Sequence, residues 1–148
     1  MAFRFPLAPL LRLRQSIERQ RALALRGASL ALARAQESLA QLDRFLADSA
    51  QADSTSLSAG RRAAELQFAL LYRENLEHLR EQVQSEIRDL ELKRQRAASE
   101  YHQAFREREA LETMRARQRR EYQQDELRRL QQQLDAAHLL QRWPHQSG

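Results

Sequence analysis

Apolar residues recur along most of this chain at alternating intervals of three and four residues. In the first half they are Leu25, Ala28, Leu32, Ala35, Leu39, Leu42 and Leu46, and in the second half Leu76, Leu79, Val83, Ile87, Leu90, Ala97, Tyr101 and Ala104. Spacing of this kind over several heptads is typical of a coiled coil, because it keeps one stripe of each helix against a partner. The pattern predicts two long helices that pack on each other.

The N-terminal end of the first helix has the same spacing in a different register. Leu10, Leu13 and Ile17 are offset by one residue from the stripe that begins at Leu25. A change of register within a coiled coil indicates a local insertion in the heptad pattern. We therefore expect a stutter near residues 20–24.

Two breaks in the pattern set the boundaries of the helices. Residues 48–60 read DSAQADSTSLSAG and gather the residue types that favour loops, while Trp143 and Pro144 interrupt the C-terminal end. The sequence predicts a helix over 8–50, a loop over 51–60 and a helix over 61–142, in a single domain spanning 1–148. Since a short loop makes the two helices antiparallel neighbours, the predicted fold is all-α, an antiparallel coiled-coil hairpin.

The second predicted helix is longer than the first and should overhang it. If residue 50 lies opposite residue 60, residue 10 lies opposite about residue 100. The second helix then runs past the N-terminal end of the first near residue 107. Residues 106–126, REREALETMRARQRREYQQDE, are rich in both signs of charge and lack a wide apolar stripe. We expect about 108–142 to have no partner in the chain, with apolar residues returning at Leu127, Leu130, Leu134, Ala137 and Leu140.

Composition supports long helices and argues against catalysis. Of 148 residues, 30% are charged and only 6% aromatic, with three Gly and three Pro, a profile of long helices and not of a compact core. The absence of Cys excludes disulfides and thiolate metal sites. The four histidines, 78, 102, 138 and 145, form no helical ligand pair, and no Gly-rich phosphate loop is present. We expect no enzyme, no cofactor and no small-molecule ligand.

The net charge of +5 lies in the N-terminal segment. Residues 1–26 hold six arginines against Glu18 alone. This segment could be a solvated helix face, or it could bind an acidic protein, an anionic membrane or a nucleic acid. Nucleic acid is not expected, because a basic-region helix needs a denser cluster ahead of a parallel zipper. No secretory signal and no apolar run of membrane-spanning length is evident, so a cytoplasmic protein is expected.

Two segments resemble the flagellar export protein family FliJ. Residues 3–14, FRFPLAPLLRLR, are similar to its N-terminal signature, and residues 111–137, LETMRARQRREYQQDELRRLQQQLDAA, resemble its charged C-terminal block. Total length and loop position match as well. The stalk proteins of virulence-type type III secretion systems share this architecture and are the alternative. A generic coiled-coil scaffold with a basic, surface-binding N-terminus is a further one.

The resemblance implies a non-enzymatic stalk of the flagellar type III export apparatus. Its implied partners are the hexameric export ATPase, the export-gate membrane protein and export chaperones, and its implied location is cytoplasmic, peripheral to the inner membrane at the flagellar basal body. The positions that the resemblance assigns to the gate are Ser38, Leu42, Phe45, Tyr72, Leu76, Leu79 and Val83.

Contact with the ATPase is expected at the opposite, charged end. There the basic N-terminal segment and the charged overhang come together, and alternating charge suits a rod end that sits in a ring without adhering to one subunit. The candidate residues are Arg12, Arg14, Arg19, Arg106, Arg108, Arg115, Arg119 and Arg120.

Overall fold

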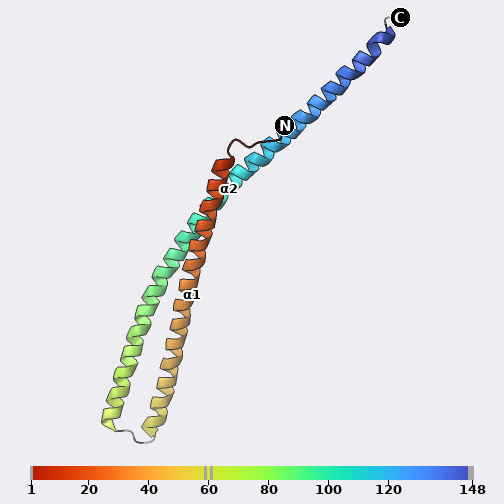
Figure 1. The fold of residues 1–148 in the computed structure, drawn as a ribbon. Coiled ribbons are helices and arrows are strands. Elements are labelled where there is room, and N and C mark those ends of the chain that lie inside the picture. The colour runs from red at the N-terminus through yellow and green to blue at the C-terminus, as the bar shows by residue number, and fades with distance from the viewer. Residues whose placement is uncertain (1, 59, 61, 147–148) are drawn as a thin grey trace. The chain divides into compact units, whose positions relative to one another are not determined.

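The chain folds into two long helices. The computed structural model describes residues 2–58, 60 and 62–146, and the side chains of 56–58 and 143–146 lie outside that description. Helix α1 spans Ala8–Ser58 and helix α2 spans Ala63–Gln146 (Figure 1). Within the described residues there is no strand. The all-α prediction is confirmed.

The two helices contribute to two compact units. Unit 1 comprises Met1–Glu18 and Gln103–Gly148, and unit 2 comprises Arg19–His102. In unit 2, Arg21 pairs with Glu100 and Asp43 pairs with Arg80, so the helices run antiparallel there. Unit 1 shows the same direction through its Arg14–Glu107 ion pair and its Phe3–Tyr122 ring contact. The antiparallel hairpin is confirmed, and the assignment of 1–148 to a single domain stays a prediction.

Helix α1 continues eight residues past its predicted end at residue 50. The Ser- and Asp-rich segment contains no Gly or Pro before Gly60. The Thr55 hydroxyl of this segment also finds a hydrogen-bond acceptor within the helix, because its Oγ1 donates to the Gln51 carbonyl at 2.9 Å. The chain turns instead at Gly60, whose φ of 78° lies in the left-handed region that favours glycine.

The C-terminal boundary differs as well. Helix α2 runs through Pro144 to Gln146, past the predicted end at residue 142. No described side chain accounts for this continuation.

The longer α1 changes which residues face each other. The predicted register put residue 10 opposite about residue 100, whereas Arg14 contacts Glu107 and Phe3 contacts Tyr122. Most of the charged stretch 106–126 therefore lies beside the N-terminal segment, and the prediction that the overhang starts near residue 108 is wrong. The overhang itself is confirmed: in the described part of unit 1, α2 has no recorded contact with the N-terminal segment after Tyr122.

Apolar seam residues form the interface in both units. The buried residues are Phe5, Leu11, Leu32, Ala35, Leu76 and Ala104. The other predicted seam residues are half-buried apart from Leu10, Leu13 and Leu79, which are exposed. The interior is therefore a narrow stripe, as the spacing predicts for a two-helix coiled coil.

The predicted stutter is absent. Leu11 is buried and its neighbours Leu10 and Leu13 are exposed. From Leu11 the three-four spacing passes through Arg14, Glu18 and Arg21 to Leu25. Charged residues occupy seam positions here. The apolar spacing therefore assigned Leu10 and Leu13 to the seam instead of Leu11.

Candidate functional site

An ionic cluster lies on the seam of unit 1. The Arg108 guanidinium donates from Nε to Glu18 Oε2 at 2.6 Å and from Nη2 to Glu18 Oε1 at 3.2 Å. Its Nη1 donates to Glu112 Oε2 at 2.7 Å, and its Cζ lies 4.9 Å from the centre of the Phe105 ring. Arg14 Nη1 donates to Glu107 Oε2 at 2.5 Å in the same region. Each of the three guanidinium nitrogens of Arg108 donates to a carboxylate oxygen, which suits its planar fork.

This cluster holds the helices together and also limits what two arginines can contact. The side chains of Arg108 and Glu18 are only 17% and 18% exposed. The hydrogen bond to Glu18 raises the pKa of Arg108 above its ordinary value, aided by the bond to Glu112 and opposed by burial. Of the arginines expected to contact the ATPase, Arg14 and Arg108 are thus engaged within the chain.

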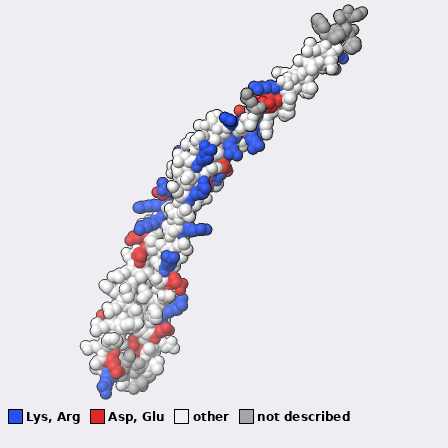
Figure 2. All heavy atoms as spheres, in the orientation of Figure 1, with Lys and Arg blue, Asp and Glu red and all other residues white. Residues whose placement is uncertain are grey.

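The other candidate arginines are exposed. Arg12 and Arg19 lie on α1, and α2 carries the rest, Arg106, Arg115, Arg119 and Arg120. Arg120 Nε donates to the Ala116 carbonyl at 3.4 Å. Figure 2 shows basic and acidic side chains interspersed on the visible face of both units.

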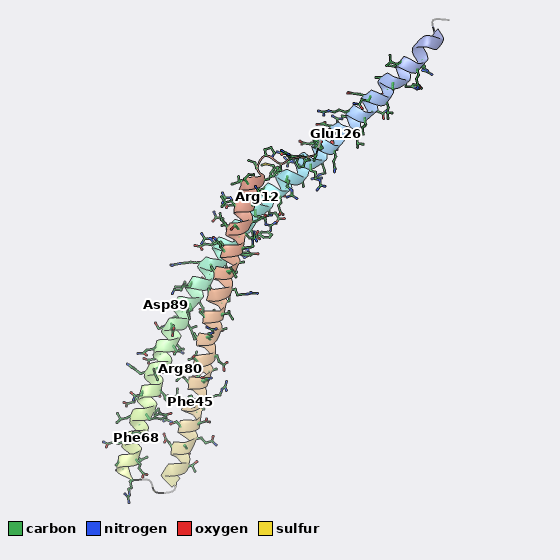
Figure 3. The ribbon with its side chains drawn as sticks, viewed as in Figure 1. Arg12, Phe45, Phe68, Arg80, Asp89 and Glu126 are labelled. Atoms are coloured by element: carbon green, nitrogen blue, oxygen red, sulfur yellow. The ribbon has the colours of Figure 1, made fainter. Side chains whose placement is uncertain are left out.

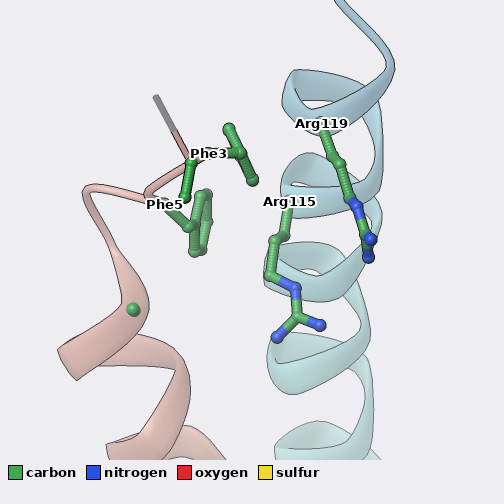
Figure 4. Close-up of a pocket in the computed structure, with 6 residues that line it drawn as sticks. Phe3, Phe5, Arg115 and Arg119 are labelled. Atoms are coloured by element: carbon green, nitrogen blue, oxygen red, sulfur yellow. The ribbon is translucent and has the colours of Figure 1, made fainter. Parts of the chain in front are cut away.

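Arg115 and Arg119 border a hollow in unit 1. The hollow has a volume of about 470 Å³ and is also lined by Ala2, Phe3, Phe5 and Ala8. In Figure 4, Phe3 and Phe5 lie on the N-terminal segment, and Arg115 and Arg119 lie on successive turns of α2. The Phe3 and Tyr122 rings are 5.7 Å apart. The ring contact links the N-terminal segment to α2, and Arg115 and Arg119 line the same hollow as Phe3 and Phe5.

Helix α2 beyond Tyr122 presents leucines to solvent. The exposed leucines in this segment are Leu127, Leu130, Leu134, Leu139 and Leu140. Ordinary surfaces carry isolated apolar residues, but a run on one helix indicates an interaction surface. We call residues 123–142 the overhang.

Unit 2 has a hollow close to its loop. It has a volume of about 350 Å³ and lies between α1 and α2. Three aromatic side chains line it and stay largely exposed: Phe45 at 54%, Phe68 at 73% and Tyr72 at 47%. Figure 3 labels Phe45 and Phe68 on the two helices. The remaining lining residues of this loop-end hollow are Asp48, Ser49, Ala52, Asp53 and Ala69.

The candidate gate residues fall into two groups. Phe45 and Tyr72 come together in the loop-end hollow. Leu42, Leu76 and Val83 are buried or half-buried seam residues.

The last two candidates lie apart from that hollow. The exposed Ser38 donates to the Arg34 carbonyl at 3.1 Å. Leu79 is exposed beside a separate hollow of about 380 Å³.

Of the eight residues that line the loop-end hollow, only Phe45 and Tyr72 were predicted gate residues. Phe68 lies one helical turn before Tyr72, so the spacing could have found it. Asp48 was predicted to be helical but opposite about residue 62, and the observed register places it opposite Phe68 and Tyr72 instead.

Among the described residues, no three or more His, Asp or Glu side chains gather in a way that could hold a metal ion. Neither helix, over its described length, has an apolar stretch sufficient to cross a membrane.

Comparison with known proteins gives one match. The family model described as the flagellar FliJ protein matches residues 3–146, which is nearly the whole chain. A search of curated proteins and a search of solved structures each returned no match.

Proposed function

This chain belongs to the FliJ family of flagellar type III protein export, and we propose that it is the stalk that engages the hexameric export ATPase at one surface and the export gate at another. In this proposal it assists the delivery of chaperones and substrates and catalyses no reaction itself. It acts in the cytoplasm, in peripheral contact with the inner membrane at the flagellar basal body. The family match favours flagellar export over the virulence-type alternative.

The observation that carries the ATPase contact is the unpartnered overhang. Helix α2 continues beyond the end of its partner segment, with five exposed leucines and no described contact to α1. A helix of this length gains most of its stability from packing, so a partner that covers the overhang would stabilise it. The exposed Arg115, Arg119 and Arg120 lie directly before it and would add charge contacts with acidic groups of a ring.

The gate contact is proposed at the loop-end hollow. Phe45 and Tyr72 are exposed there, and large aromatic side chains that are free to be buried are the usual anchors of protein interfaces. Ser38 and Leu79 are exposed on the same unit and remain candidates. Leu42, Leu76 and Val83 would support the surface from the seam.

A truncation after Gln124 tests the ATPase contact. It removes the overhang and keeps the Phe3–Tyr122 contact and the ionic cluster. We expect near-unchanged helix content per residue and an unchanged main melting transition, but a loss of binding to the ATPase hexamer and of ATPase stimulation. A chain ending at Arg142 is the control and should stimulate normally.

Two outcomes would separate this proposal from its alternative. Full stimulation by the chain ending at Gln124 would contradict a role of the overhang in ATPase contact. If that chain also changed from dimer to monomer in sedimentation, the overhang would instead serve a generic coiled-coil scaffold.

A further inference from the structure

The loop-end hollow combines aromatic rings with carboxylates and lacks a basic lining residue. Phe45, Phe68 and Tyr72 supply the rings, and Asp48 and Asp53 supply the negative charge. The aromatic side chains come from both helices, as Figure 3 shows for Phe45 and Phe68. The volume of about 350 Å³ is at the small end of the range for ligand pockets, roughly 300–1,000 Å³. It is suited to one side chain of a partner.

The two carboxylates differ in their present contacts. Asp53 Oδ2 lies 3.9 Å from Arg73 Nη2, a long ion pair in which both side chains are partly exposed. Asp48 has no ion pair among the described residues. The nearby Arg44 lies 3.7 Å from Glu37 instead. The hollow therefore holds one carboxylate already bordered by a guanidinium and one that has none.

We propose that the loop-end hollow receives a cationic side chain, arginine or lysine, from a segment of a protein partner. A cation between ring faces is attracted by their negative π-clouds, and a carboxylate next to the rings adds a charge-assisted hydrogen bond. Arginine fits better than lysine, because its guanidinium is weakly hydrated and stacks on aromatic planes. The identity of the partner rests on the proposed gate contact, whereas the chemistry of the hollow does not.

Other occupants match the hollow less well. An acidic segment would be repelled by Asp48 and Asp53. A purely apolar segment would cover the rings but would also desolvate the Asp48 carboxylate without giving it a partner, which is unfavourable. A cationic side chain with an aliphatic stem satisfies both the rings and the carboxylate.

A direct test uses two short peptides and the full-length chain. The probes are acetyl-Gly-Arg-Gly-amide and the same peptide with neutral citrulline in place of arginine, followed by NMR of the aromatic ring signals. We expect the arginine peptide to shift the signals of Phe45, Phe68 and Tyr72 and the citrulline peptide to leave them unchanged. Asp48→Asn should weaken the shifts, and Asp89→Asn, which changes an exposed carboxylate elsewhere in unit 2, should leave them unchanged. Equal shifts from both peptides, or none, would overturn the proposal.

A second measurement addresses the partner. The cytoplasmic part of the export-gate protein is titrated with the full-length chain and its variants. Asp48→Asn should weaken binding by about threefold and Phe68→Ala by about fivefold, in the range of exposed charge pairs and cation–π contacts. Asp89→Asn and Leu92→Ala, which change an exposed carboxylate and an exposed apolar side chain outside the hollow, should bind as the parent does.

The two measurements fail in different ways. If the parent chain does not bind the gate protein but the arginine peptide shifts the rings, the proposed gate contact is wrong and the cation-binding hollow stands. If the parent chain binds the gate and both Asp48→Asn and Phe68→Ala bind equally well, the hollow is not used and the inference is overturned.

Discussion

Arg108 on α2 donates two parallel hydrogen bonds to Glu18 on α1, from Nε to Oε2 at 2.6 Å and from Nη2 to Oε1 at 3.2 Å. Both side chains occupy seam positions that would hold leucine in an ordinary coiled coil. A buried or half-buried ionic pair on a seam is satisfied in only one alignment of the helices, so it specifies register more than it adds stability. The pair fixes how far the N-terminal segment reaches along α2.

Replacing Arg108 by lysine should loosen the N-terminal segment of unit 1. Lysine keeps the charge but cannot donate the two-pronged bond to Glu18 while also bonding Glu112. We expect faster amide hydrogen exchange over residues 8–18, with residues 25–46 unaffected. Arg120→Lys, which alters an exposed arginine with no carboxylate partner among the described residues, is the control. Unchanged exchange in Arg108→Lys would show that the charge alone holds the segment.

The pH dependence of this effect follows from the direction of the pKa shift. The pKa of Arg108 is raised above its ordinary value, chiefly by the hydrogen bond to Glu18. The stabilisation is then fully present below the unfolded-state pKa and is lost only as pH rises through the higher folded-state pKa. The penalty of Arg108→Lys, measured by exchange corrected for intrinsic rates, should therefore be equal at about pH 6 and about pH 8.

Two glycines should respond oppositely to the same substitution. Gly27 lies inside α1, and a Cβ there would meet nothing within 4 Å, so Gly27→Ala should raise the free energy of unfolding by about 1 kcal/mol. Gly60 has equally open space but a φ of 78°, so Gly60→Ala should lower it by about 1 kcal/mol. Thermal or denaturant melts of the two variants provide the measurement. Stabilisation by both would show that the turn at Gly60 does not require a left-handed residue.

The register of the N-terminal segment can be tested with leucines. Leu11 is 3% exposed, and Leu11→Ala should cost about 2–3 kcal/mol of unfolding free energy. Leu10→Ala and Leu13→Ala, at the positions that the apolar pattern favoured, should each cost under about 1 kcal/mol because these side chains are exposed. Denaturant melts of the three variants decide between the registers. A larger loss of unfolding free energy for Leu13→Ala than for Leu11→Ala would support the predicted stutter.

Substitutions in the aromatic residues of the loop-end hollow should weaken binding without the loss of stability expected of seam substitutions. Phe45→Ala combined with Tyr72→Ala should weaken binding to the gate protein while lowering the free energy of unfolding by less than about 1 kcal/mol, since both side chains are largely exposed. Leu42→Ala combined with Leu76→Ala should instead lower stability strongly. Binding titrations and melts on the same samples distinguish the cases. Parallel loss of binding and stability in the aromatic variant would place those residues in the core.

The sequence pattern predicted the fold because two-helix coiled coils obey a simple rule. The three-four spacing of leucine and alanine identified the stripe of both helices, and nearly every predicted seam residue from Leu25 to Ala104 is buried or half-buried. The rule failed where charged residues took the same positions. An apolar pattern cannot identify Arg14, Glu18 and Arg108 as seam residues, because their burial depends on a partner far away in the chain.

Local composition was also a weak guide to the loop. Serine and aspartate favour loops in general, yet they stay helical up to Ser58 because no Gly or Pro stops them and Gly60 supplies the turn. That difference changed the register, so that most of the charged stretch 106–126 lies beside the N-terminal segment and the overhang starts after Tyr122. It also brought Asp48 to the hollow that holds Phe45, Phe68 and Tyr72.

Spacing and composition therefore determine that this chain forms two long antiparallel helices with a longer second one, since helical periodicity is a local property written in consecutive residues. Which residues face each other is not local. It was decided by the position of one left-handed glycine and by ion pairs such as Arg108 with Glu18, whose partners meet only once the chain has folded back on itself.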